Sequence, residues 1–298
     1  MSTATTANGR IARRRKAQAG DAQRPLWIRL GFVFWLAVFW IALITFGAVF
    51  ADILPFADPL KTNLSKTFHP IGQDGFILGA DQIGRDMLSR IVHGAQISLK
   101  LAFTAPFISL VLGVTLGMCA GYFRGRVDGA IGIFVDSILA FPNIIAIMAI
   151  LFFLGPTLIN MILVLGFFGM VGDLRVARAN TILYAEREFV IAARAQGASH
   201  LRIMFRELLP NVIIPVLALA IIGMSRVIVI EGILSFLGVG LPPPTPTWGK
   251  MISEGYSELG YAPHITFVPA AVMFFTILSF NLIGDRLRTL TNARAGQI

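Results

Sequence analysis

The residues that could do covalent chemistry in this chain are few and scattered. Cys119 is the single cysteine of the 298-residue sequence, which excludes an internal disulfide and any metal site built from paired cysteines. The four histidines, His69, His93, His200 and His264, stand far apart, and the His-Glu-x-x-His motif is absent. The sequence therefore offers no nucleophile with a neighbouring base and no cluster of metal ligands. We expect no catalytic residue and no metal site.

Two glycine-containing runs resemble nucleotide-binding motifs only in part. A P-loop needs Gly-x-x-x-x-Gly-Lys-Ser/Thr, but Gly249-Lys250 is followed by Met251, and Pro244 occupies the position of the first glycine. Gly238-Val239-Gly240 begins a dinucleotide fingerprint, but Pro243 replaces its third glycine. The chain therefore has no ATP-binding motif of its own, and we expect it to bind no cofactor.

Ionisable residues inside apolar runs are the strongest remaining functional candidates. Asp136, Arg226 and Glu231 fall within such runs, where a charge is costly and is usually retained for function. We expect them to border a water-filled translocation path, in which mixed charge would suit a zwitterionic peptide. A structural ion pair, within the chain or with a second subunit, is the alternative. Arg226 and Glu231 are five residues apart, too far around a helix for an ideal pair.

A second polar group lies outside the apolar runs. Asp81, Arg85 and Asp86 could contact a protein that delivers substrate, or could cap a short helix expected near residues 86–92. Trp248 follows a proline-rich run and is expected to anchor that segment at the membrane interface, or to contact a binding protein outside the membrane.

The elements that carry these residues are predicted to be membrane-spanning helices. The chain is 56% hydrophobic and 14% charged, with a mean hydropathy of +0.75, whereas soluble domains carry about 25% charged residues. Backbone groups cannot stay unpaired in lipid, so long apolar runs must form helices. The sequence therefore predicts an all-α membrane protein. Its six transmembrane helices are expected near residues 30–51, 97–122, 127–153, 156–178, 211–237 and 265–284.

The distribution of basic residues predicts the orientation. With the N-terminus in the cytoplasm, eighteen arginines and lysines lie in inside segments, and only five lie outside. Both termini are therefore expected to be cytoplasmic. The net charge of +9 is spread between apolar spans, which argues against nucleic-acid binding. The predicted segments are a disordered basic tail (1–29), a first transmembrane helix (30–53), an extracytoplasmic segment (54–95), a five-helix core (96–285) and a cytoplasmic tail (286–298).

The longest inside connection, residues 179–210, is predicted to be two helices separated by a break. Small residues at helical spacing give the first helix a face that another backbone can approach closely. Gly197 suits the left-handed conformation that ends a helix, and Ser199 can cap the next one. The second helix is predicted to have an apolar stripe. The stripe consists of Leu201, Met204, Phe205 and Leu208.

The same loop resembles the cytoplasmic loop of binding-protein-dependent ABC transporter permeases. The resemblance is carried by Ala192-Ala193-Arg194-Ala195-Gln196-Gly197 and Leu209-Pro210-Asn211, which match the family's Ala, Gly, Leu and Pro positions. The family's Glu position is Ile191 here, and its Ile position is Glu207.

Three further stretches resemble the second membrane subunit of dipeptide, oligopeptide and nickel importers. They are Gly79 to Arg90, Phe236 to Gly240 with the prolines and Trp248 that follow, and Asn281 to Arg288. With the loop, they extend the resemblance over most of the chain from about residue 30 onward.

The resemblance implies a type I ABC importer transmembrane domain in the bacterial plasma membrane, with peptides as the commonest cargo. It implies a sister permease, two ATPase subunits that bind ATP and magnesium, and an extracytoplasmic substrate-binding protein as partners. The implied ATPase-coupling residues are Glu188, Phe189, Ala192, Ala193, Arg194, Gly197, Ala198, Leu209 and Pro210.

Two other classes of protein remain as alternatives. A proton-coupled secondary transporter would use Asp136 and Glu231 as a proton relay, but such carriers usually contain internal repeats, and none is clear here. A membrane-embedded enzyme would need the nucleophile or the metal cluster that the sequence does not offer.

Overall fold

Helices form almost all of the regular structure in this chain. A computed structural model describes residues 30–295, and these residues contain no strand beyond two isolated β-bridges. The main helices are α3 (Phe32–Val49), α4 (Met87–Phe123), α5 (Gly125–Leu139), α6 (Asn143–Leu154), α7 (Leu158–Ala185), α8 (Glu188–Ala195), α10 (Leu209–Phe236), α11 (Trp248–Gly255) and α12 (His264–Ala295). Shorter helical turns are η1 (Leu64–Lys66), α9 (His200–Arg202), η2 (Ile203–Leu208) and η3 (Tyr256–Glu258). The basic tail predicted for residues 1–29 lies outside the described residues.

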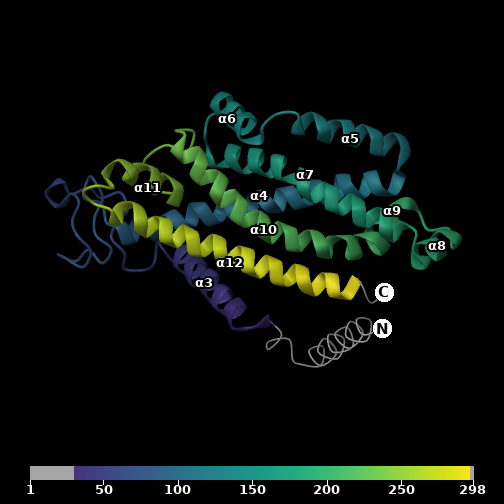
Figure 1. Cartoon of the computed structure of the whole chain (residues 1–298), viewed down its shortest axis with the longest axis horizontal. Coiled ribbons are helices and arrows are strands. Elements are labelled where there is room, and N and C mark those ends of the chain that lie inside the picture. The colour runs from purple at the N-terminus through teal and green to yellow at the C-terminus, as the bar shows by residue number, and fades with distance from the viewer. Residues whose placement is uncertain (1–29, 296–298) are drawn as a thin grey trace, which may run out of the picture.

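The long helices run up and down an elongated bundle (Figure 1). One end, here called the α8 end, carries α8, α9 and the turn between α4 and α5. The opposite end, here called the α11 end, carries α11 and the loop segment between α3 and α4. The core forms where α4, α7 and α10 pack together, and α12 and α3 lie along one side of α10 and α4.

The described residues include five helices that are long and apolar enough to cross a membrane: α3, α4, α7, α12 and the continuous run from α9 to α10. The span predicted at residues 127–153 is not one straight helix. It consists of α5 and α6, which meet at an angle of 83°. Pro142 precedes α6, and because a proline ring disfavours helical geometry in the residue before it, the chain turns here. The predicted total of six spans holds when this bent pair counts as one.

Helix α4 begins earlier than predicted. The short amphipathic piece expected near residues 86–92 is the first turn of α4, and the Asp86 side chain accepts a hydrogen bond from the Ser89 backbone N–H at 2.7 Å. With 37 residues, α4 is about 55 Å long, well beyond the ~30 Å hydrocarbon core of a bilayer. The segment predicted for residues 54–95 therefore includes the first turns of α4. The tail predicted for residues 286–298 likewise begins inside a helix, because α12 continues to Ala295.

Three glycines one turn apart let α4 lie directly against α7. A Cβ atom added to Gly113, Gly117 or Gly121 would come within 2.8 Å of α7 atoms. Small residues spaced every four positions allow membrane helices to pack at short range. Among the described helices, α4 and α7 share the most extensive contact.

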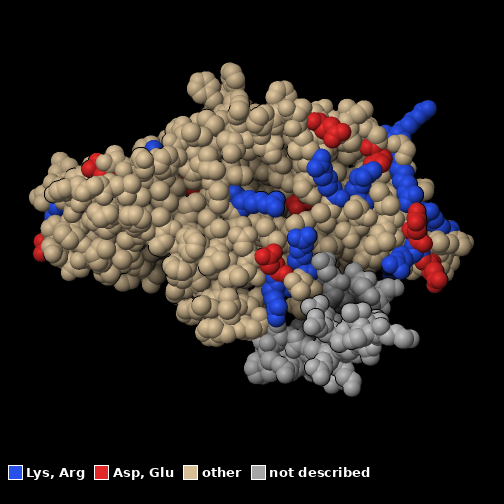
Figure 2. All heavy atoms as spheres, in the orientation of Figure 1, with Lys and Arg blue, Asp and Glu red and all other residues tan. Residues whose placement is uncertain are grey.

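Charge is concentrated toward one end of the bundle. Figure 2 shows charged side chains gathered at the α8 end, and the face over the middle of the bundle is mostly uncharged. Two ion pairs join helices at the α8 end. The Arg178 Nε and Nη2 atoms bind both carboxylate oxygens of Asp128, at 2.5 and 2.6 Å, and Arg124 binds Glu186 at 2.7 Å. An uncharged middle with a charged end is the pattern expected of a membrane-embedded bundle.

Candidate functional site

The loop between α7 and α10 is built as the sequence predicts. Gly197 has φ of +78°, and its N–H donates to the Arg194 carbonyl, while the Ala198 N–H reaches back to the Ala193 carbonyl. This pair of bonds ends α8 in the left-handed conformation that glycine adopts without strain. The Ser199 side chain then accepts a hydrogen bond from the Arg202 N–H and begins the next helix. The predicted helix–break–helix arrangement is confirmed.

Helix α8 presents one face to the bundle and leaves the other uncovered. Val190 is fully buried, and Ala193 and Ala198 pack beside it against the core. Phe189, Ile191 and Ala192 are exposed. Of the other implied coupling residues, Glu188 opens α8 and is exposed, Leu209 packs on the core, and Pro210 is exposed near the start of α10. The uncovered side of α8 is therefore short and exposes apolar side chains beside the Glu188 carboxylate.

An aromatic residue of α4 holds α8 in position. The Arg194 guanidinium lies over the Tyr122 ring, 5.1 Å from its centre, and the Tyr122 hydroxyl is 2.9 Å from the His200 Nδ1 atom. One buried tyrosine thereby touches both helical pieces of the loop. Because Tyr122 lies at the last turn of α4, the loop is connected to α4 as well as to its sequence neighbours α7 and α10.

The apolar stripe predicted on the second helix is half wrong. Met204 and Leu208 are buried, but Leu201 and Phe205 are each 67% exposed. Residues Ile203–Leu208 form a π-helical turn, in which hydrogen bonds span five residues. The wider turn changes the angular spacing of side chains, so the four residues no longer share one face. Ile203, outside the predicted stripe, is buried in their place.

A polar groove runs between α4, α6, α7 and α10, at the middle of the bundle. It has a volume of about 420 Å³, and its polar lining includes Ser109, Asp173 and Arg226. Asp173 is only 7% exposed, and its Oδ2 atom accepts a hydrogen bond from the Ser109 hydroxyl at 2.5 Å. Arg226 is exposed on α10 and acts electrostatically on Asp173.

Only one of the three charges predicted to border a path lines this groove. Arg226 does, but Asp136 is exposed on α5 and outside it. Glu231 is 1% exposed, and its Oε1 atom accepts hydrogen bonds from Ser235 at 2.8 Å and from Thr247 at 2.7 Å. The prediction for Glu231 is therefore wrong, because its carboxylate fastens the start of α11 to α10. Asp173 was not identified from the sequence, although an ionisable residue in an apolar run was the available signal.

Trp248 is not an interface anchor. Its side chain is 0% exposed, its Nε1–H donates to the Ile91 carbonyl at 3.1 Å, and its backbone N–H donates to the Ser98 hydroxyl at 3.2 Å. The ring therefore joins α11 to α4. The prediction of an exposed binding-protein contact at this residue is wrong, since no surface of the side chain remains available.

A buried ion network replaces the exposed contacts predicted at Asp81 and Arg85. Asp81 pairs with Arg85 at 2.5 Å and with Arg90 at 3.5 Å, and both arginines reach the Glu254 carboxylate of α11, at 3.3 and 3.1 Å. Asp81, Arg85 and Arg90 are buried. The exposed contact predicted for Asp81 and Arg85 is therefore wrong, whereas the alternative that Asp86 caps a helix is confirmed. This network ties the segment before α4 to α11.

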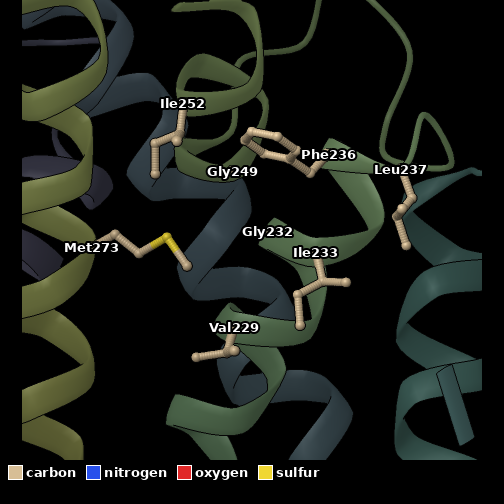
Figure 3. Close-up of a pocket in the computed structure, with 8 residues that line it drawn as sticks. All are labelled: Val229, Gly232, Ile233, Phe236, Leu237, Gly249, Ile252 and Met273. Carbon is tan, nitrogen blue, oxygen red and sulfur yellow. The ribbon is translucent and has the colours of Figure 1, made fainter. Parts of the chain in front are cut away.

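A second groove, beside α11, has a different character. Figure 3 shows its lining, contributed by α10, α11 and α12, in which Val229, Ile233, Phe236 and Met273 carry no polar side-chain group. The groove therefore has no group that could orient a charged or hydrogen-bonding molecule. The groove lined by Asp173 and Arg226 differs from this one, because it carries opposite charges between membrane-spanning helices.

Comparisons with known proteins agree on one family. The family described as binding-protein-dependent transport system inner membrane component matches residues 113–297. The dipeptide transport system permease protein of Alkalihalophilus pseudofirmus is 37% identical over 242 residues, which cover 81% of this chain and 79% of that protein. The di/tripeptide permease of Pseudomonas aeruginosa is 36% identical over 83% of both chains. A glutathione permease of Escherichia coli is 38% identical over 70% of this chain and 69% of that protein.

Solved structures give the same fold. The MetNI methionine ABC transporter, in an inward-facing conformation, aligns with a TM-score of 0.56 and 19% identity over 69% of this chain and 97% of that chain. An amino acid ABC transporter aligns with a TM-score of 0.51 and 17% identity, over 68% and 94%. At this identity the likeness shows the fold alone, which is that of a type I ABC importer transmembrane domain. Since the family match covers more than half of the sequence and these relatives span most of it, the chain is a multi-pass membrane protein that belongs to the family of binding-protein-dependent transport system inner membrane components.

Proposed function

We propose that this chain is one of two permease subunits of an ATP-driven importer that takes up short peptides by alternating access. The observation that carries the proposal is the loop at the α8 end. It exposes the apolar side chains of Phe189, Ile191 and Ala192 on a helix fixed at both ends. Such a face suits close approach by another protein, which we take to be an ATPase subunit.

Force applied to α8 would reach the transmembrane helices through defined contacts. Val190 anchors α8 in the core, and the Tyr122 contacts to Arg194 and His200 join the loop to α4. Closure of two ATPase subunits around ATP and magnesium would therefore move α4, α7 and α10 together. In this proposal the chain is a translocation subunit that binds no nucleotide, and a sister permease completes the pathway.

Peptides are the proposed cargo because two of the relatives are named for dipeptide or di/tripeptide transport, and another is named for glutathione, itself a tripeptide. An extracytoplasmic binding protein would deliver the peptide at the α11 end. The proton-coupled alternative is not supported, because Asp136 and Glu231 lie on different helices, with one exposed and the other buried among hydroxyl groups.

Reconstitution of the complex tests the proposal. Tagged chain should co-purify with ATPase subunits, and liposomes containing the complex and its binding protein should take up labelled dipeptide only with ATP. Uptake driven by a proton gradient without ATP would contradict the proposal.

Crosslinking tests the role of α8 directly. In a Cys119→Ser background, a cysteine at Ala192 should crosslink to an ATPase subunit. A cysteine at Arg126, which is also exposed at the α8 end, serves as the matched control and should crosslink weakly.

Gly197→Val should abolish peptide-stimulated ATP hydrolysis, since valine strongly disfavours a φ of +78°. Equal crosslinking at both sites, or stimulation that survives Gly197→Val, would remove α8 from the coupling role.

A further inference from the structure

The groove between α4, α6, α7 and α10 lies along the middle part of long apolar helices. Asp173 is twelve residues before the end of α7 and fifteen after its start, or about 18 and 22 Å from the two helix ends. Ser109 is likewise well inside α4, and Arg226 is ten residues before the end of α10. Polar groups at this depth are costly in lipid and are retained facing a water-filled cavity or a partner.

Asp173 is held in one orientation at the wall of this groove. The Ser109 hydroxyl occupies one carboxylate oxygen, and no described residue donates a hydrogen bond to the other. Arg226 acts on Asp173 through space, but no ion pair joins the two side chains. Among the described residues the Arg226 guanidinium has no ion-pair or hydrogen-bond partner, although it lies on a membrane-spanning helix. The lining also includes Arg175, which is exposed on α7. The groove thus carries one carboxylate and two guanidinium groups, and no ion pair joins Asp173 to Arg226.

Glycines keep the groove open. A Cβ atom added to Gly172 would meet nothing within 4 Å, and one added to Gly223 would touch only Pro106, at 3.8 Å. Both glycines line the groove. Helix packing within this chain does not require them, in contrast to Gly113 or Gly117. They leave space beside Asp173 and Arg226 that larger side chains would fill.

We propose that this groove binds the charged ends of a short peptide during passage, with the peptide carboxylate on Arg226 and the peptide ammonium beside Asp173. The proposal rests on the proposed function and adds the part of the substrate that the chain recognises. A guanidinium matches a carboxylate in a two-bond geometry. The two arginines of the lining would attract a simple anion, but only a ligand that also carries a cation satisfies Asp173. The volume of about 420 Å³ lies within the range of about 300–1,000 Å³ typical of small-molecule sites.

Transport of paired substrates tests the site. The reconstituted complex is given a dipeptide with a free carboxylate and the same dipeptide amidated at its C-terminus, and the ratio of the two uptake rates is measured. Arg226→Gln should lower this ratio about tenfold, the size expected when a charge-assisted hydrogen bond is lost. Asp173→Asn should do the same to the ratio of free to N-acetylated dipeptide. Because the binding protein is common to every variant, its own selectivity cancels.

Matched controls separate recognition from folding. Lys100→Gln and Asp136→Asn remove an exposed charge from α4 and α5 outside the groove, and they should leave both ratios unchanged. If Arg226→Gln slows both substrates equally, the side chain is structural or pairs with the sister permease, and the proposal is wrong. Unchanged ratios in both groove variants would also overturn it.

A labelling experiment does not depend on the cargo. Ile230 lines the same groove one turn beyond Arg226, and in a Cys119→Ser background Ile230→Cys would be the single cysteine. The labelling rates of a sulfonate-bearing methanethiosulfonate and of its trimethylammonium counterpart are each divided by the reagent's rate with a free thiol, which removes their different intrinsic reactivities. Arg226→Gln should lower the ratio of the anionic to the cationic reagent about tenfold, because it removes a positive charge one turn from the label, and Asp173→Asn should raise this ratio. A ratio that neither variant changes would refute the role of these two charges. If the wild-type complex takes up no peptide, the proposed function fails, while labelling still decides whether Arg226 and Asp173 act on a charged molecule in the groove.

Discussion

Buried hydroxyl and carboxylate groups hold α11 against the bundle. Glu231 accepts hydrogen bonds from Ser235 and Thr247, and both hydroxyl-bearing side chains are almost fully buried. A buried donor without an acceptor costs about 1–3 kcal/mol. The contribution of Glu231 is therefore expected to come from its acceptor oxygen, and its charge is not required for these two bonds.

Two substitutions at Glu231 separate these contributions. Glu231→Gln keeps a side-chain oxygen and should leave the thermal stability of the purified complex close to that of wild type. Glu231→Leu leaves Thr247 and Ser235 without an acceptor and should lower stability by about 2 kcal/mol or more. Thermal unfolding of the detergent-purified complex measures both. Equal damage from the two variants would show that the charge is what matters.

Tyr122 carries the second prediction at this scale. Tyr122→Phe keeps the ring beneath Arg194 but loses the hydroxyl contact with His200, worth about 1 kcal/mol. Amide hydrogen exchange in α8 should then speed up about fivefold. Tyr122→Leu removes both contacts and should accelerate exchange further. Exchange that is unchanged in both variants would mean that α4 does not hold the loop.

At the scale of helices, glycine has two distinct uses in this bundle. Gly113, Gly117 and Gly121 bring α4 against α7, where an added Cβ would collide with backbone or side-chain atoms. Gly129 on α5 has open space around it. A larger side chain should therefore be tolerated at Gly129 but not at the three glycines of α4.

Valine substitutions test this difference. Gly117→Val places its Cβ about where the Leu174 carbonyl and the Ala177 side chain already lie. It should therefore lower the free energy of unfolding of the complex by about 1–3 kcal/mol or more, and with it the yield. Gly129→Val introduces the same side chain without a collision and serves as the control. Yield and thermal unfolding of the purified complex are the measurements. A tolerated Gly117→Val would show that α4 and α7 are not in close contact.

For the whole molecule, the distribution of charge predicts the direction in which the bundle is inserted. Arginines concentrate at the α8 end, and basic side chains are retained on the cytoplasmic side during insertion. The α8 end should then face ATPase subunits in the cytoplasm, and the α11 end should face a binding protein outside.

Cysteine labelling in intact cells tests this orientation. In a Cys119→Ser background, Tyr261→Cys lies near the α11 end and Gln196→Cys in the α8 loop, and both native residues are exposed. A membrane-impermeant maleimide should label residue 261 in intact cells and residue 196 only after permeabilisation. The reverse pattern would invert the predicted topology and remove α8 from contact with a cytoplasmic ATPase.

Local sequence patterns were enough to predict several features because their causes are local. Apolar runs must form helices in lipid, a glycine in the left-handed conformation ends α8, and Asp86 and Ser199 cap the helices that follow them. The sequence marked the start of α4 at Asp86, but it did not show that this first turn continues into the long apolar span. That continuity depends on packing, because the first turns of α4 are stabilised by Trp248 and by the ion pair of Arg90 with Glu254, which are far away in sequence.

The sequence by itself determined membrane residence, the helical class, the family resemblance and the loop at the α8 end, because each depends on residue type and spacing along one chain. The tertiary structure decided which charges meet. Trp248 and Arg85 looked available in the sequence, but Trp248 bonds to Ile91, 157 residues away, and Arg85 reaches Glu254, 169 residues away. Glu231 is buried among hydroxyl groups that include Thr247. Asp173 and Arg226 became neighbours in one groove because close packing of α4, α7 and α10 brings distant positions to the same depth.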